Sequence, residues 1–223
     1  MNAFFCYAKN NIRCGIGTIA LILAASVGFC DAESWVMAKW VADGDTIILY
    51  DGRHVRYIGI DTPEIDHKNH RAEPMGYSAQ SVNRKLVDAW QLRLVYDREK
   101  TDRYGRTLAY VYRSDGLFVN AELLKLGYAH FLYRFPNIGK EKILLSAQRE
   151  AMGSGRGIWQ NVKKDHEQPH GYIGNRRSRR FHARDCPMGK SISEKNRIGL
   201  KNQWDGFWSG FAPARECIKF PPP

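Results

Sequence analysis

Short β-rich segments separated by turns most constrain what this chain can fold into. Five segments are rich in β-branched and aromatic residues, at 33–41, 46–50, 54–60, 91–97 and 106–112. Turn pairs such as Asp51-Gly52 separate them. Three helical patterns follow or interrupt them, at 78–90, 119–128 and 139–153. Because this order is not the alternation of a parallel sheet, it predicts a mainly β, α+β fold: a small closed five-stranded barrel with three packed helices.

The first 32 residues have the layout of a secretory signal peptide. Lys9 and Arg13 precede the apolar run "GIGTIALILAASVGF", and small residues follow it. We expect cleavage after Ala32. The run is short for a bilayer span, which needs about 20 residues. The sequence therefore predicts export to the periplasm or the medium, with no stable membrane association after cleavage.

The charge of the exported chain indicates an anionic partner. Removing Lys9, Arg13 and Asp31 from 34 basic and 23 acidic residues leaves 32 and 22, a net charge of +10. Residues 163–223 hold 13 of the remaining basic residues but 6 of the acidic ones. The polar, Pro- and Gly-containing stretch before the last 50 residues is typical of a linker. We predict a domain at 33–162, a linker at 163–173 and a small basic module at 174–223. No protein partner is inferred.

Four of the five acidic residues between positions 41 and 65 flank Arg56, one of the two arginines in this stretch. They are Asp43, Asp45, Asp61 and Glu64, with Arg56 between them. Pairing of the two strands that Asp45 and Asp61 flank would bring these carboxylates to one end of the barrel. Two carboxylates and a backbone carbonyl suit a hard cation such as Ca²⁺. For the "DGD" stretch alone, a simple turn is the better interpretation.

Two arginines favour a phosphodiester substrate. Strand alternation places Arg56 on the face of Ile58 and Ile60, where a solvated arginine is unexpected. Arg106 begins the strand after the tight "DRYG" stretch. Guanidinium forks bind phosphoryl oxygens, and a metal neutralises further charge. Glu64, after the Pro63 bend, is placed to orient or deprotonate a water molecule.

These motifs resemble those of the staphylococcal nuclease (thermonuclease) family. The resemblance covers about residues 35 to 162 and rests on "DGDT", "R-x-x-x-I-D-T-P-E", "TDRYGRTLAYVY" and the closing "GIW". It implies an OB-fold barrel and Ca²⁺-dependent, largely sequence-nonspecific cleavage of DNA and RNA, with 3′-phosphorylated products. Competing hypotheses are a noncatalytic OB-fold module that binds nucleic acid, and a surface interaction protein.

The resemblance also assigns roles to single residues. Asp45 and Asp61 would bind calcium with the carbonyl of Thr62, and Asp43 would support these ligands from behind. Glu64 would be the general base. Arg56 and Arg106 would stabilise the charge of the pentacovalent phosphate in the transition state.

Three aromatic residues match substrate-contacting positions of the family. Tyr104 would lie near a nucleotide phosphate, while Tyr133 and Phe135 would line the nucleotide pocket. Phe135 stands where the family has a tyrosine, so it can stack on a base but has no hydroxyl to donate. For Tyr133 and Phe135, ordinary packing in the barrel remains an open alternative.

The C-terminal module contains two cysteines and a cluster of arginines. Cys6, Cys14 and Cys30 would leave with the signal peptide, so Cys186 and Cys217 are an even pair in an oxidising compartment, which predicts a disulfide. A zinc ion held by these thiols and His182 is the alternative, although three ligands are few for a structural site. A module of about 50 residues would have a marginal core that a disulfide could stabilise. The arginines, which either bind nucleic acid or form a solvated surface, are Arg176, Arg177, Arg179 and Arg180.

Overall fold

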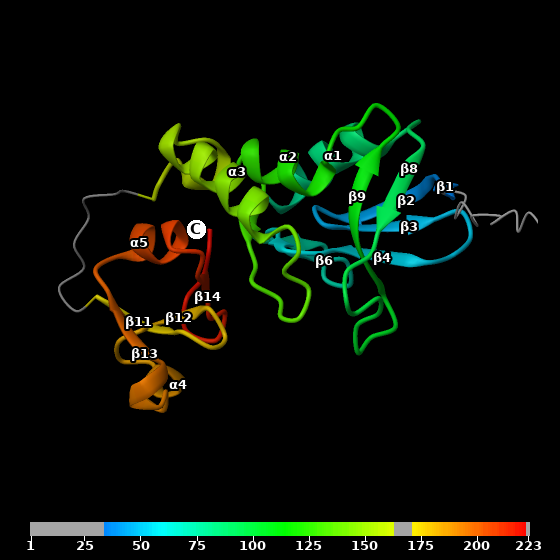
Figure 1. Cartoon of the computed structure of the whole chain (residues 1–223). Helices are drawn as coiled ribbons and strands as arrows, with labels where there is room; N and C mark the ends of the chain where they lie inside the picture. Colours follow the sequence, from blue (N-terminus) through cyan, green and yellow to red (C-terminus); the bar gives the residue numbers. More distant parts are fainter. Residues whose placement is uncertain (1–33, 163–170, 222–223) are drawn as a thin grey trace, which may run out of the picture. The chain divides into compact units, whose positions relative to one another are not determined.

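The computed structural model describes residues 34–162 and 171–221 (Figure 1). The predicted signal peptide and most of the predicted linker lie outside these residues. A six-stranded sheet has the strand order β1-β8-β9-β4-β3-β2. Its strands are Trp35–Val36 (β1), Ala38–Asp43 (β2), Thr46–Leu49 (β3), His54–Tyr57 (β4), Leu92–Val95 (β8) and Thr107–Arg113 (β9). The mixed α+β fold with a barrel-like sheet, as predicted, is therefore confirmed.

Two of the five predicted strands are interrupted. The first is broken at Met37 between β1 and β2. The third ends at Tyr57, because Gly59 adopts a φ of 79°, and the chain resumes as β5, Ile60–Asp61. That short strand pairs with β10, His130–Phe131, which the sequence did not reveal. The break at Gly59 turns the chain so that Asp61 returns toward the start of β3.

Three helices accompany the sheet, as predicted. They are Gly76–Val87 (α1), Val119–Lys125 (α2) and Glu141–Gly153 (α3). Helix α2 packs against both α1 and α3, and α1 also packs against β2 (Figure 1). Fully buried side chains from these elements form the barrel core, among them Ile47, Val55, Leu108, Leu123 and Leu144. The loop before α1 contains a short hairpin, Ile65–Asp66 (β6) and Arg71–Ala72 (β7).

The C-terminal segment forms a second, four-stranded sheet in the order β13-β11-β12-β14. Its strands are Tyr172–Asn175 (β11), Arg180–Ala183 (β12), Arg197–Leu200 (β13) and Ala212–Pro213 (β14). Its helices are Pro187–Lys190 (α4) and Gln203–Trp208 (α5), with a 3-10 turn at Glu194–Asn196 (η2); another 3-10 turn, Gly157–Trp159 (η1), ends the nuclease domain. Strand β11 begins at Tyr172, within the range predicted for the linker.

This C-terminal segment shares a hydrophobic core with α3 and η1. The ring centroids of Trp159 and Phe207 lie 4.9 Å apart, and those of Trp159 and Phe220 lie 5.6 Å apart. The buried amide of Gln148 accepts the N–H of Phe131 at 2.5 Å and donates to the carbonyl of Phe207 at 2.7 Å. The expectation that the module depends on a marginal core of its own is therefore wrong, because residues of the nuclease domain complete that core.

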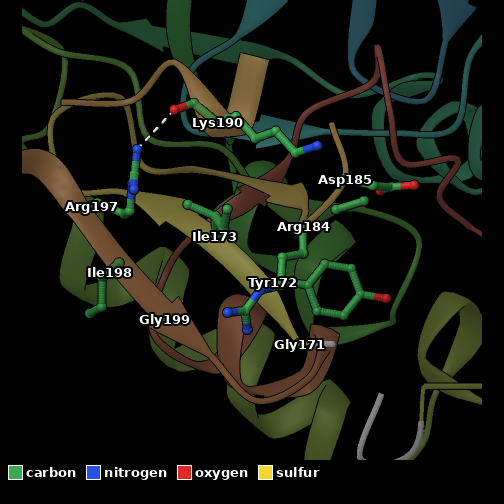
Figure 2. Close-up of a pocket in the computed structure, with 10 residues that line it drawn as sticks. Gly171, Tyr172, Ile173, Arg184, Asp185, Lys190, Arg197, Ile198 and Gly199 are labelled. Carbon is green, nitrogen blue, oxygen red and sulfur yellow. Dashed lines mark hydrogen bonds between the residues drawn. The ribbon is translucent and has the colours of Figure 1, made fainter. Parts of the chain in front are cut away.

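A groove of about 770 Å³ lies on the C-terminal sheet (Figure 2). Basic side chains line it beside Tyr172, namely Arg184, Lys190 and Arg197. The guanidinium of Arg197 donates to the carbonyl of Lys190 at 2.8 Å. Of the four arginines predicted as a cluster, none lines this groove.

Within residues 34–162 and 171–221, no helix has the length and apolar character needed to span a bilayer.

Candidate active site

A tight turn between β2 and β3 positions the first carboxylates. Asp43 accepts the backbone N–H of Asp45 at 3.0 Å. Asp45 is buried, and its Oδ2 accepts the backbone N–H of Thr62 at 2.9 Å. This bond joins the turn to the end of β5, 17 residues later in the chain. Asp43 therefore shapes the turn, while Asp45 faces the second half of the predicted site.

The turn packs so closely against its neighbours that only glycine fits at position 44. A Cβ on Gly44 would lie 2.7 Å from Oγ1 of Thr62 and 2.8 Å from the Cβ of Ala79. We expect Gly44→Ala to push the turn away from Thr62 and to lower the free energy of unfolding by about 1–3 kcal/mol, as overpacking does. Chemical denaturation measures this change. Gly199→Ala is the matched control, because an added Cβ there meets nothing within 4 Å; equal losses in the two variants would contradict the explanation.

Arg56 joins the two predicted metal-binding carboxylates. Its Nη1 lies 2.7 Å from Oδ2 of Asp45, and its Nη2 donates to Oδ1 of Asp61 at 2.8 Å. The Arg56 side chain is 12% exposed, and the two carboxylates are 6% and 7% exposed. Antiparallel pairing of β3 with β4 places Thr46 opposite Arg56, which brings Asp45 to the same end of the barrel. The hairpin therefore places Asp45 beside Arg56, and the turn at Gly59 brings Asp61 back to the same guanidinium.

The two carboxylates share Arg56 but differ in the direction of their pKa shifts. Burial raises the pKa of Asp45 well above its ordinary value, outweighing the attraction of Arg56. Burial acts in the same direction on Asp61, but the positive charges around that residue prevail and lower its pKa. The largest of these contributions comes from His130, which is charged only at the low pH at which Asp61 itself titrates, and the next comes from Arg56. A cation bound between the two carboxylates would favour the ionised form of both.

Glu64 lies beyond the Pro63 bend at the edge of the same cluster. Its side chain is 54% exposed, and its Oε1 accepts a hydrogen bond from Arg215 at 2.9 Å. The backbone N–H of Glu64 donates to Glu73 at 2.9 Å, so the β6–β7 hairpin holds its main chain. Burial raises the pKa of Glu64, and the charge of Arg215 opposes that rise. A half-exposed carboxylate is open to a water molecule, as a general base requires.

The side chain of Arg106 pairs with Asp102 in this structure. Its Nε donates to Oδ2 of Asp102 at 2.8 Å, and its backbone N–H donates to Oδ1 of Asp102 at 3.0 Å. The guanidinium lies 5.5 Å from the ring centroid of Tyr104, which is 67% exposed. Strand β9, which follows Arg106, runs parallel to β4 and pairs Leu108 with Arg56. The half-buried guanidinium of Arg106 and the exposed ring of Tyr104 therefore lie together at the start of the strand next to Arg56.

The two aromatic residues predicted to line the nucleotide pocket differ in their environment. Tyr133 is partly buried and packs against the barrel core. The guanidinium of Arg179 lies 5.8 Å from its ring centroid, so one arginine of the predicted cluster faces the barrel. Phe135 is 69% exposed and precedes a cis peptide bond to Pro136. Its exposed ring is free to stack on a base.

Two residues that the sequence reasoning missed also contact Asp61. Nε2 of the buried His130 lies 3.6 Å from Oδ2 of Asp61, because β10 pairs with β5. Burial lowers the pKa of His130 to about 4, so its ring is neutral at pH 7. Arg215 donates to the same oxygen at 2.9 Å. The short apolar segments "AHF" (129–131) and "GID" (59–61) could have been paired as strands, which would have placed His130 opposite Asp61. The segment "APAREC" contains no pattern that indicates a contact of Arg215.

Cys186 and Cys217 are free thiols in this structure, so the predicted disulfide is not formed. Both sulfur atoms instead face Nδ1 of His182, at 3.8 and 3.6 Å. The ligand atoms of these three side chains all lie within 4.8 Å of one another. They form the cluster of potential metal ligands found among the described residues. These are the three residues that the sequence indicated as the alternative zinc site. Their arrangement matches the zinc alternative in ligand type.

Comparison with known proteins identifies the family. Residues 54–161 match the family described as staphylococcal nuclease homologue. The chain is 42% identical over 131 residues to a thermonuclease of Staphylococcus intermedius, covering 57% of this chain and 77% of that protein. It is 39% identical over 124 residues to a thermonuclease of Staphylococcus hyicus, covering 54% and 73%. It is 37% identical over 139 residues to the endonuclease YncB of Bacillus subtilis (strain 168), covering 60% and 62%.

The chain therefore belongs to the staphylococcal nuclease family. The predicted family and the predicted class of enzyme, a nuclease, are confirmed. The family match ends at residue 161, so it does not include the C-terminal module.

Proposed function

We propose that this chain is an exported, calcium-dependent and largely sequence-nonspecific nuclease that hydrolyses DNA and RNA to 3′-phosphorylated products. One observation carries the proposal: Arg56 contacts both Asp45 and Asp61 in a buried cluster at the end of the barrel. Membership in a family of metal-dependent nucleases supports the reaction class. The charge of +10 expected after signal cleavage suits a polyanionic substrate.

The donor atoms of this cluster fit a hard cation. They are carboxylate oxygens of Asp45 and Asp61 and the carbonyl oxygen of Thr62, with Asp43 behind them. Arg215 donates to Asp61 and to the carbonyl of Thr62, at 2.9 and 3.3 Å, so these oxygens already face a positive group. Two carboxylates and one carbonyl would leave the rest of a calcium shell to water. When bound, calcium would neutralise charge on the scissile phosphate and polarise a phosphoryl oxygen.

The side chains around the cluster carry out the proton transfer and stabilise the transition state. Glu64 accepts a proton from the attacking water, whose oxygen forms a bond to phosphorus. The bond between phosphorus and the 5′ oxygen breaks, which leaves a 3′-phosphate, and the 5′ oxygen takes a proton from solvent. Arg56 has N–H groups beyond those that contact the carboxylates, and these together with Arg106 stabilise the charge of the transition state.

The substrate lies along the aromatic residues next to this cluster. Tyr104 contacts a phosphate of the bound nucleotide, and Tyr133 and Phe135 line the pocket for its base. Stacking on an aromatic ring tolerates any base, which accounts for cleavage with little sequence preference. Export follows from the signal peptide predicted at residues 1–32.

Digestion of plasmid DNA and RNA by the secreted protein tests this function. We expect both substrates to be degraded with millimolar-scale Ca²⁺, and we expect excess EGTA to abolish degradation because the site is modest and completed by water. Product ends should become labelled by polynucleotide kinase without phosphatase treatment, since hydrolysis leaves a 5′-hydroxyl. Binding without cleavage would instead support the noncatalytic OB-fold module. Full activity in EGTA would contradict the calcium assignment.

A further inference from the structure

Arg215 extends from the C-terminal segment into the acidic cluster of the nuclease domain. Its Nη1 donates to Oε1 of Glu64 at 2.9 Å. Its Nη2 donates to Oδ2 of Asp61 at 2.9 Å and to the carbonyl of Thr62 at 3.3 Å. One guanidinium therefore contacts two of the three groups proposed to hold calcium, and also the proposed general base.

Arg215 and calcium would bind the same oxygen atoms of Asp61 and Thr62, so the two cannot occupy them together. A lone pair of Asp61 or Thr62 that accepts an N–H of Arg215 cannot at the same time face a metal ion. The same guanidinium donates to Oε1 of Glu64, so that oxygen faces Arg215 and not a water molecule. The contact therefore occupies the metal-binding oxygens and covers one oxygen of the proposed base.

The backbone around Arg215 is anchored by contacts that do not involve its side chain, and the side chain borders open space. The N–H of Ala214 donates to the carbonyl of Phe181 at 2.8 Å, and the N–H of Ile218 donates to the carbonyl of Ala214 at 2.9 Å. Ala214 and Ile218 are both buried. The Arg215 side chain is 39% exposed and borders a cavity of about 590 Å³. A change of rotamer can therefore release the acidic oxygens without undocking the segment.

We propose that Arg215 competes with calcium for the active site. Without calcium, its guanidinium holds Asp61, the carbonyl of Thr62 and Glu64, and the base is masked. Calcium binding displaces the side chain and frees Glu64 to accept a proton. The proposal rests on the calcium-dependent function described above and adds a regulatory role for the C-terminal module. Since both cations use the same oxygens, each must weaken the binding of the other.

Calcium titration by calorimetry, without nucleic acid, tests the competition. We expect Arg215→Gln to bind calcium about tenfold more tightly than the parent, within the roughly 5- to 150-fold range of such couplings. Arg215→Lys should lie between the two, because an ammonium cannot contact Glu64 and Asp61 with a planar fork. Thermal unfolding with and without calcium provides a second readout: calcium should raise the melting temperature of Arg215→Gln by more than that of the parent.

Arg180→Gln is the matched control for charge alone. Arg180 also lies near Asp61 and borders the same cavity, but its guanidinium donates to the carbonyl of Pro213 at 3.0 Å. Its substitution should raise calcium affinity clearly less than Arg215→Gln does. An equal rise in both variants, or an unchanged or weaker affinity in Arg215→Gln, would overturn the competition. Absence of calcium binding by the parent and by both variants would instead overturn the proposed function.

Discussion

Glu64→Gln is expected to lower the turnover number by about 10²- to 10⁴-fold, the contribution that a general base typically makes. The substitution keeps the size of the side chain and removes its ability to accept a proton. Nucleic-acid affinity should stay nearly unchanged, because a loss confined to the transition state appears in kcat. Steady-state kinetics at saturating calcium, beside direct binding of the substrate at two salt concentrations, separates the two effects.

Glu73→Gln is the matched control for this prediction. Glu73 lies in the same hairpin and accepts the backbone N–H of Glu64 at 2.9 Å. A glutamine retains a carbonyl oxygen for that bond, so the turnover number should remain close to that of the parent. If Glu64→Gln kept near-parental turnover, Glu64 would not be the base and the proposed mechanism would fail.

Arg56→Lys is expected to reduce the turnover number by about 10²- to 10³-fold, although the charge is kept. The loss is comparable to removal of one preorganised donor from a transition-state binding site. The guanidinium contacts Asp45 and Asp61 with different nitrogens, at 2.7 and 2.8 Å, and still has donors for a phosphate. A single ammonium cannot reproduce this planar fork. Kinetic measurements should be made at a temperature where unfolding curves show that the variant is folded.

Arg53→Lys controls for an arginine-to-lysine change in the same hairpin. Arg53 pairs with Asp51 at 2.7 Å, and their side chains are 39% and 48% exposed. Exposed pairs of this kind contribute little, so its kinetics and stability should match those of the parent. Equal activity of Arg56→Lys and Arg53→Lys would show that the buried fork has no special role.

The barrel and most of its site were predictable because the signals are local. β-branched segments and turn pairs define the strands, and a hairpin between two strands brings the acids that flank them together. Asp45 and Arg56 illustrate this, since the β3–β4 pairing determines their proximity, whereas Asp61 reaches Arg56 only after the break at Gly59. The break at Gly59 was less predictable, because a left-handed glycine inside a β-rich run is not evident from strand propensity alone.

Contacts between distant segments were not predictable in the same way. Arg215 reaches Glu64 across 151 residues, and Gln148 bonds to Phe207 across 59. Such contacts depend on how α3, η1 and α5 pack, which the hydrophobic pattern of each element does not specify. The same packing supplies the core that a separate module would lack, so the module did not need a disulfide to complete it.

A calcium titration followed by binding and by cleavage on the same sample tests the central claim most directly. We measure heat of binding without substrate, and the initial rate of DNA hydrolysis at each calcium concentration. We predict that cleavage rises with occupancy of a single site, and that Asp61→Asn weakens binding and shifts the activation curve to higher calcium in parallel. Cleavage that proceeds at full rate in excess chelator, or calcium binding that Asp61→Asn leaves unchanged, would contradict the account.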